Sequence, residues 1–287
     1  MAVPGIRRVG ASLARPADAV GSRLAEVGNH LVFYARVIGY IPMALVRYWN
    51  HIVRLIAEIS FGTATILAAG GTVGVVFAMS FVSGAQVGLE GFRGLDLVGL
   101  APLSGAVSGL VNTRELAPVV AGIALAAKVG TGFTAQLGAM RISEEIDALE
   151  TMSVNSLPFL VTTRLIAAFL TVIPLYLVGL FAAYASTRFI VVNVNGQSSG
   201  NYDRWFELML PTEDVFLSLV KALILAMVVT LIHCYYGYNA SGGPEGVGRA
   251  AGRALRTSIV MIMIVDILLT FAFWGVFMEL PGLGGQP

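Results

Sequence analysis

The residues of this sequence that could do chemistry are charged side chains that stand inside apolar runs. Arg114 and Glu115 are adjacent near the start of one run, Lys128 lies later in the same run, and Lys221 and Asp266 lie in two others. An ionisable side chain is expensive to bury in apolar surroundings, so it usually has a partner or a function. These five residues are therefore the first candidates for a site.

Lys221 and Asp266 lie at depths that allow an ion pair. Asp266 is about nine residues, or roughly 14 Å along a helix, from the start of its run, and Lys221 is about eight residues, or roughly 12 Å, from the start of its own. Two antiparallel runs crossing a core of roughly 30 Å would bring both side chains near its middle. Lys128 is a competing partner. A substrate or gating role for Asp266 is the alternative to a structural pair.

A second candidate is an acidic segment between two apolar runs. It places four acids within seven residues, namely Glu144, Glu145, Asp147 and Glu150. One interpretation is a solvated helix start, in which Ser143 is the N-cap and the first two acids stabilise the positive end of the helix.

The other interpretation of the acidic segment is a docking surface. Glu144 and Asp147 share a helix face at a spacing of three residues and repel each other unless a basic partner meets them. Ile146 and Leu149 would then supply apolar anchors for that partner.

Other polar residues are weaker candidates. His233, beside Cys234, could form an intramembrane serine hydrolase with Ser83 or Ser108, but neither serine lies in the Gly-x-Ser-x-Gly pattern of a nucleophile elbow. A packed, hydrogen-bonded histidine is therefore favoured. A further set of acids is expected to form a solvated rim rather than a metal site: Glu90, Asp96, Asp203, Glu207, Glu213 and Asp214.

The composition defines the elements that must position these residues. Apolar residues make up 56% of the 287 positions, charged residues only 12%, and the mean hydropathy is +0.80. A soluble globule of this size needs about twice that charged fraction, so the chain is predicted to be an integral membrane protein. A net charge of +1 argues against a nucleic-acid partner, and a single cysteine excludes an internal disulfide framework.

The apolar runs predict an all-α protein with five transmembrane helices. A helix needs about 20 residues to cross the membrane, and the runs that meet this length are 62–89, 113–140, 157–189, 213–238 and 257–279. The shorter stretch 97–111 is expected to be either a re-entrant piece or an outward extension of the second helix, broken near Asn112. The runs lack the strict alternation of strands.

The region before the first span divides into two parts. Residues 1–30 contain four arginines and are predicted to form a cytoplasmic tail. Residues 31–56 are predicted to form an interfacial amphipathic helix bent at Pro42, in which three arginines fall within about 20° of one another. A sixth full span is the alternative. The three arginines are Arg36, Arg47 and Arg54.

Basic residues orient the chain. With the N-terminus inside, the inner segments hold twelve arginines and the outer loops three, so the positive-inside rule places the N-terminus in the cytoplasm and the C-terminus outside. The inner set is Arg7, Arg8, Arg15, Arg23, Arg36, Arg47, Arg54, Arg141, Arg164, Arg249, Arg253 and Arg256. The outer set is Arg93, Arg188 and Arg204.

Several of these segments together resemble the MlaE/YrbE permease family. They are Arg114-Glu115-Leu116-Ala117-Pro118, Lys128-Val129-Gly130, Gln136-Leu137-Gly138-Ala139-Met140, Glu144-Glu145-Ile146-Asp147-Ala148-Leu149, Tyr236-Gly237-Tyr238, Gly243-Pro244-Glu245-Gly246-Val247-Gly248-Arg249-Ala250 and Asp266. The doubled acid Glu144-Glu145 is most similar to the YrbE branch of actinobacterial Mce systems. Members commonly have Arg and Glu where this chain has Lys128 and Gln136.

The resemblance implies a permease domain over 57–280, followed by a tail at 281–287. In such a permease, 143–152 would be the coupling helix, with Glu144, Glu145, Asp147 and Leu149 facing an ATPase, and Arg114 and Glu115 would lie at a lipid cavity. The chain has two lysines, and neither follows a glycine-rich phosphate loop. We therefore expect no cofactor in this chain, and ATP and Mg to be bound by a partner ATPase.

The resemblance also implies partners and a location. We expect a heterodimer with a paralogous YrbE permease, an ATPase dimer on the cytoplasmic side, Mce-domain proteins outside and a lipid substrate, with fatty acid as the cargo, in the plasma (inner) membrane. Two other functions are alternatives: a scaffold that only anchors Mce proteins, and the intramembrane hydrolase. Copurification of an ATPase together with Mce proteins would favour transport over both.

The predicted topology can be tested by cysteine labelling in a Cys234→Ser background. Single cysteines in 141–156 and 239–256 should react only from the cytoplasmic side, and those in 190–212 only from outside, because the basic residues are concentrated in the former segments. A cysteine at position 145 that reacts from outside would contradict the orientation.

Overall fold

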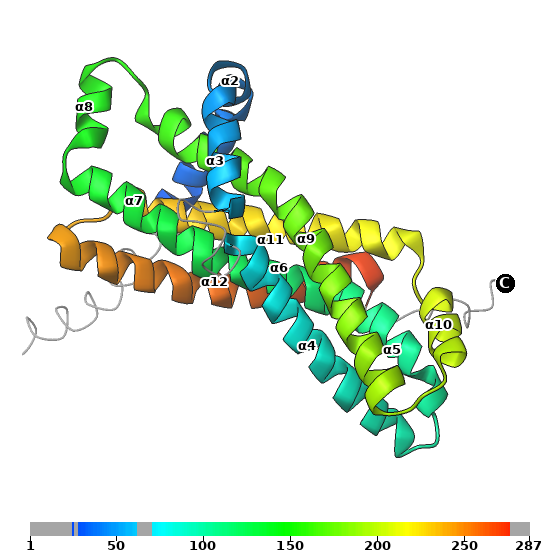
Figure 1. Cartoon of the computed structure of the whole chain (residues 1–287). Coiled ribbons are helices and arrows are strands. Elements are labelled where there is room, and N and C mark those ends of the chain that lie inside the picture. Colours follow the sequence, from blue (N-terminus) through cyan, green and yellow to red (C-terminus); the bar gives the residue numbers. More distant parts are fainter. Residues whose placement is uncertain (1–24, 26–27, 62–70, 276–287) are drawn as a thin grey trace, which may run out of the picture.

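The long apolar segments of the sequence form helices. This is expected for a membrane protein, because every backbone N–H and C=O group inside the membrane needs a hydrogen-bond partner within the protein. The computed structural model describes residues 25, 28–61 and 71–275, and every regular element in these ranges is helical (Figure 1). Five helices are long and apolar enough to span a membrane: Gly71–Asp96, Ala101–Ile142, Leu157–Val194, Thr212–Tyr238 and Gly243–Trp274. The all-α membrane fold is thus confirmed. Residues 62–70, where the first span was expected to begin, and most of both predicted tails lie outside the described residues.

The second and third spans are composites of α-helix and wider π-helical turns, and the second begins with a tighter 3₁₀ turn, η1. The second runs through η1 (Ala101–Leu103), α5 (Ser104–Val111), η2 (Asn112–Leu116), α6 (Ala117–Ala124), η3 (Leu125–Gly130) and α7 (Thr131–Ile142). The third runs through η4 (Leu157–Thr162), α9 (Thr163–Phe189) and η5 (Ile190–Val194). The remaining elements of the bundle are α4 (Gly71–Asp96), α8 (Glu145–Thr151), α10 (Ser199–Leu208), α11 (Thr212–Tyr238) and α12 (Gly243–Trp274).

Two of the predicted boundaries were wrong. The stretch 97–111 does extend the second helix, but the helix continues through Asn112 as a π turn instead of breaking there. The last helix begins at Gly243 rather than near 257, so most of the expected loop 239–256 is helical. Hydropathy marks where a helix can cross a membrane, whereas polar helix formers extend it beyond that limit.

The described residues between 28 and 61 form three short helices rather than one. Residues 28–39 are helical, followed by α2 (Ile41–Arg47) and α3 (Trp49–Phe61), and the axes of the first two differ by 43°. Pro42 lies in the first turn of α2, a position that proline favours because it needs no N–H donor there. The segment bends near Pro42 as predicted, but it is divided between three helices, so the three arginines do not lie along one continuous helix. The three arginines are nevertheless all exposed. If the bent pair were counted as a span, the total would be six.

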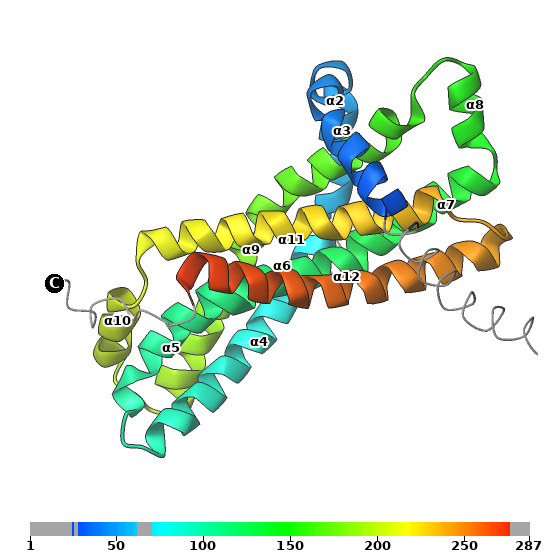
Figure 2. The same cartoon turned by 180° about the vertical axis from the view of Figure 1, so that it is seen from behind.

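The bundle has two distinct ends (Figures 1 and 2). Helices α2, α3 and α8 lie toward one end, whereas α10 and the connection between α4 and α5 lie at the other. We call these the α8 end and the α10 end. Helices α11 and α12 run side by side between them, and α4 packs along α9.

Glycine allows α4 and α9 to approach closely. A Cβ atom at Gly84 would lie 2.6 Å from the carbonyl oxygen of Ala183 and 2.7 Å from its Cα. Gly88 faces α9 and η5 in the same way, and Gly105 lies against the backbone of Tyr202 in α10. These glycines therefore serve packing within the chain, as small residues commonly do between membrane helices.

Gly84→Ala should destabilise the protein, because the added methyl group meets backbone that cannot rotate away. Overpacking of this kind costs about 1–3 kcal/mol. Gly94→Ala, in the same helix with no atom within 4 Å of the added Cβ, is the matched control and should be neutral or stabilising. Thermal unfolding of the two purified variants in detergent measures the difference. Equal midpoints would contradict the tight contact.

Candidate functional site

In the apolar part of the second span, residues 101–140, the charged residues all lie in π turns. Arg114 and Glu115 belong to η2, and Lys128 belongs to η3; residues 101–140 contain no other charged side chain. A π turn adds one residue to a helical turn, displaces the neighbouring side chains and occurs frequently at functional sites. The sequence thus concentrates charge where the helix is locally widened.

Pro118, directly after η2, explains how a lysine is recruited to this turn. Proline has no N–H group, so it cannot donate the α-helical hydrogen bond to the carbonyl oxygen of Arg114 four residues earlier. Instead, Lys221 of α11 donates from Nζ to that oxygen at 2.9 Å. A cation from another helix therefore satisfies the acceptor that Pro118 leaves without its usual donor.

Lys221 is the centre of an intramembrane charge cluster. Its side chain is 0% exposed, and Nζ lies 2.7 Å from Oδ1 of Asp266 and 2.9 Å from Oε2 of Glu115. It also donates to Oγ1 of Thr270 at 2.8 Å, and that hydroxyl lies 2.8 Å from Oε1 of Glu115. The predicted Lys221–Asp266 pair is confirmed, and Glu115 joins it.

A second buried ion pair adjoins the first. Nη2 and Nε of Arg114 lie 2.6 Å and 2.7 Å from Oδ2 of Asp214, and both residues are only 6% exposed. Trp274 donates from Nε1 to the other oxygen of Asp214 at 2.7 Å, and the guanidinium carbon of Arg114 lies 5.2 Å from the indole ring centroid. Arg114 is thus held by a carboxylate and by a cation–π contact.

Helical spacing brings the cluster together. Asp266, Thr270 and Trp274 lie four residues apart along one face of α12, and Asp214 and Lys221 lie seven apart on α11. Both faces meet η2, so the cluster joins the second, fourth and fifth spans. It contains three carboxylates and two cations. Of these five charged side chains, Glu115 is the one with substantial exposure, at 42%.

The structure changes the expectations for Arg114 and for Asp214. Asp214 was assigned to a solvated rim, which is wrong, because it is buried against Arg114. Arg114 does not lie on an open surface as a head-group receptor, although within the described residues its buried Nη1 atom has no hydrogen-bond partner. A role of Arg114 and Glu115 at a lipid cavity stays a prediction. Trp274 and Thr270 were missed, although their spacing from Asp266 signalled a shared face.

Asp203, another of the acids assigned to a solvated rim, has a partner. Arg188 donates from Nε and Nη2 to the two carboxylate oxygens of Asp203, both at 2.9 Å. This hydrogen bonding lowers the pKa of the Asp203 carboxyl below its ordinary value. Because both side chains are exposed, the pair contributes little to stability.

Lys128 does not compete for Asp266. It is exposed and lines a cavity of about 100 Å³ together with Glu58 and Gln136. Gln136 donates to Oε1 of Glu58 at 3.2 Å and accepts from Nη2 of Arg164 at 3.3 Å. Arg164, one of the twelve arginines assigned to the inner segments, is buried in this second polar group.

The acidic segment forms α8, a helix of seven residues at the α8 end. Two residues with left-handed backbone flank it, Glu144 (φ 59°) and Ser153 (φ 61°), which is uncommon for residues other than glycine. The predicted N-cap at Ser143 is wrong: this residue ends α7, and its hydroxyl donates to the carbonyl of Ala139 at 3.0 Å. Glu144 itself occupies the cap position, so the chain turns sharply into α8.

The side chains of α8 divide into an anchored face and a free face. Ile146 is 0% exposed within the core and Leu149 is partly buried, so Ile146 fixes α8 to its own chain and cannot anchor a partner as predicted. Glu144, Glu145 and Asp147 are exposed. Asp147 has a partner within the chain, Arg141, at 2.7 Å.

His233 has a structural environment. It is 0% exposed, its Nδ1 atom lies 3.0 Å from Oγ1 of Thr134, and its Nε2 atom lies 3.2 Å from Oγ of Ser258. Ser108, one of the serines considered for a hydrolase, is instead bonded to Tyr202 and Asn112. The favoured interpretation of a packed, hydrogen-bonded histidine agrees with this geometry.

Removal of Lys221 should destabilise the fold, because it leaves buried carboxylates without a cation. Breaking one side of a buried pair costs about 3–5 kcal/mol, whereas replacing all the partners by neutral or apolar groups is often tolerated. Lys221→Met should therefore lower the thermal unfolding midpoint strongly. The triple variant Lys221→Met, Asp266→Leu, Glu115→Gln should recover much of the loss. A triple variant no more stable than the single one would show that uncompensated charge is not the cause.

Comparison with known proteins places the chain in a family. A family model described as permease MlaE matches residues 61–272. The probable ABC transporter permease protein of Rickettsia prowazekii (strain Madrid E) is 30% identical over 252 residues, which is 87% of this chain and 97% of that protein. A protein of the same name from Rickettsia bellii (strain RML369-C) is 35% identical over 203 residues, which is 70% of this chain and 78% of its own.

A plant protein is also similar to this chain, at slightly lower identity. The chloroplastic protein trigalactosyldiacylglycerol 1 of Arabidopsis thaliana is 29% identical over 203 residues, covering 71% of this chain and 58% of that protein. The family match covers the first to fourth spans as the structure describes them and nearly all of the last, and it includes the charged residues of the cluster but not Trp274. The chain therefore belongs to the MlaE permease family and is a multi-pass membrane permease.

Proposed function

We propose that this chain is the transmembrane permease subunit of an ABC-type Mce lipid importer, with fatty acid as its cargo, and that it couples a separate cytoplasmic ATPase to lipid movement. The rickettsial relatives are named as probable ABC transporter permeases, and the Arabidopsis relative carries the name of a glycerolipid. ATP and Mg bind to the partner ATPase. The lysines of this chain lie in a buried cluster and beside a polar cavity, not in a phosphate loop.

The proposed coupling to the ATPase is supported by the way in which α8 is packed. Its exposed acids Glu144, Glu145 and Asp147 project from the α8 end, while Ile146 is fixed in the core of the same chain. When a basic groove of the ATPase moves the acidic face of α8, the buried Ile146 makes the bundle move with it. Coupling helix 143–152 is the segment that does this.

The continuous second span offers a path from α8 to the charge cluster. Helix α7 ends where α8 begins, and the same helix extends back through η3 to η2, which holds Arg114 and Glu115. Closure of the ATPase dimer would move α8, and the π turns are the points at which the span can change its side-chain register. The cavity that alternates in access lies beside Glu115, the exposed member of the cluster.

The assembly proposed around this chain has three other kinds of component. A paralogous YrbE permease forms a heterodimer with it, Mce-domain proteins deliver lipid at the α10 end, and the ATPase dimer docks at the α8 end. This arrangement places α8 and the N-terminus on the cytoplasmic side of the plasma (inner) membrane and the C-terminus outside. It follows the asymmetry of basic residues between the two ends.

Reversing the charge of the free face of α8 tests the proposal. The double variant Glu145→Lys, Asp147→Lys should lose the ATPase, because two attractive contacts with a basic groove become repulsive. Truncation of interfacial charge pairs typically costs about 2–5 kcal/mol, which corresponds to roughly 30- to 4,000-fold in affinity. Loss of the exposed Asp147–Arg141 pair costs only about 0.2–1 kcal/mol, so the fold should survive.

The matched control reverses two exposed acids at the other end of the bundle. Glu207→Lys, Glu213→Lys makes the same change in net charge at the α10 end and should leave ATPase binding intact. Pull-down of the ATPase from membranes at matched expression provides the measurement. Full recovery of the ATPase with the α8 variant, or equal loss with both variants, would refute coupling through α8.

A further inference from the structure

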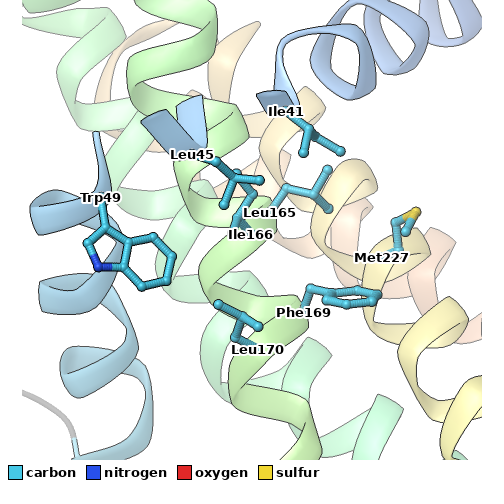
Figure 3. A pocket seen from close by; sticks show the side chains of 8 residues that line it. All are labelled: Ile41, Leu45, Trp49, Leu165, Ile166, Phe169, Leu170 and Met227. Atoms are coloured by element: carbon cyan, nitrogen blue, oxygen red, sulfur yellow. The ribbon is translucent and has the colours of Figure 1, made fainter. Parts of the chain in front are cut away.

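An apolar pocket of about 320 Å³ lies between the bent N-terminal helices and the bundle (Figure 3). Its walls come from α2, α3, α9 and α11, and the side chains of these four helices surround one space. The lining residues are Ile41, Leu45, Trp49, Leu165, Ile166, Phe169, Leu170 and Met227. The charge cluster around Lys221 contributes none of them, so this pocket is separate from the cavity proposed for transport.

The pocket is held open by contacts on more than one side. Thr162 donates to the carbonyl oxygen of Val37 at 3.1 Å, which ties the first N-terminal helix to the third span. Farther along, the rings of Tyr48 and His51 pack on Phe159 with centroids 5.2 Å and 5.0 Å apart. These tethers hold the bent segment against the third span, and the space enclosed between them is a preformed cavity.

The chemistry of the walls indicates a hydrocarbon occupant. The lining surface has no polar atoms, and water enters a cavity only where two or more polar groups can bind it. Leu45 and Trp49 are partly exposed, so the pocket communicates with the surroundings of the chain. Next to a membrane-spanning helix, those surroundings are lipid acyl chains. The volume lies at the lower end of ligand pockets, enough for part of one acyl chain rather than a whole two-chain lipid.

The charge beside the pocket indicates the head group. Arg47 lies two residues from Leu45 and two from Trp49, so its Cα is within about 8 Å of the Cα atoms of both lining residues. It is exposed and ends α2. Residues 28–61 contain a single carboxylate, Glu58, which is engaged by Gln136. Arg47 is therefore an exposed cation on the segment that lines the pocket, and a guanidinium is suited to a phosphate.

We propose that this pocket binds one acyl chain of an anionic phospholipid from the leaflet at the α8 end, and that Arg47 binds the phosphate of that lipid. The lipid is a resident ligand that fills the space between the N-terminal helices and α9, not the transported molecule. It joins α2 and α3 to the third span by burying the walls of the pocket. The inference does not depend on the ATPase or on the cargo.

Photocross-linking of the full chain in lipid nanodiscs tests this site. The probe is a phosphatidylglycerol with a diazirine in the middle of one acyl chain, and a phosphatidylcholine with the same chain is its neutral counterpart. After illumination, cross-linked peptides should include Leu45 and Phe169 of the pocket. Leu177 and Phe181, on the exposed face of α9, report ordinary contact with bulk lipid.

Filling the pocket should remove the pocket signal alone. In Leu170→Trp, cross-links at Leu45 and Phe169 should be lost while those at Phe181 persist. Leu177→Trp, the same substitution seven residues along α9 but outside the pocket, should keep the pocket signal. Leu45→Trp fills the pocket from the opposite wall and repeats the test if Leu170→Trp does not fold.

The head-group contact has its own measurement. Phosphatidylglycerol should label the pocket more than phosphatidylcholine, and Arg47→Gln should reduce that ratio about fivefold, the effect of one basic residue near an anionic surface. Three results would overturn the proposal: no labelling of the pocket in the native chain, unchanged labelling in both pocket-filling variants, or equal labelling by the two lipids. Protein–protein cross-links at Leu45 would instead assign the pocket to a second chain.

Discussion

The arrangement of the spans depends on the ion pairs of one fully buried ammonium group, that of Lys221. A lone charge in hydrocarbon is prohibitive, so Lys221 requires carboxylates, and it has two, Asp266 and Glu115, on two different helices. The same ammonium satisfies the carbonyl of Arg114. Three spans are thereby held in one relative register. Displacement of any of them would separate charges that have no other partner among the described residues.

Both charged residues of the π turn η2 reach this cluster. In η2, both are directed to the side where α11 and α12 meet, and Arg114 binds Asp214 while Glu115 binds Lys221. The packing elsewhere is close and apolar, as at Gly84 and Ala183. The polar contacts therefore specify which helices associate, and the glycines determine how closely.

Sequence alone predicted the fold and part of the cluster. Five apolar runs gave five spans, and simple depth arithmetic paired Lys221 with Asp266, because charge in a membrane has few alternatives. It failed at Asp214, since the residue lies at the edge of its run, where hydropathy cannot distinguish a solvated acid from a buried one. It also failed at Ile146, because periodicity identifies an apolar face but not whether that face packs on the same chain or on a partner. In 31–56 it located the bend near Pro42 but not the second break, at Tyr48.

The sequence separation within the cluster imposes an order on its biogenesis. Asp214, the partner of the Arg114 side chain, is synthesised 100 residues after Arg114. Lys221, which donates to the Arg114 carbonyl oxygen, is synthesised 107 residues after it. At about 5–20 residues per second of synthesis, the second span remains without these partners for roughly 5–20 s after Arg114 is made. During that interval Arg114 and its carbonyl need water or the insertion machinery as a temporary solvent. The second span therefore cannot be released into lipid as a finished helix before the fourth has emerged.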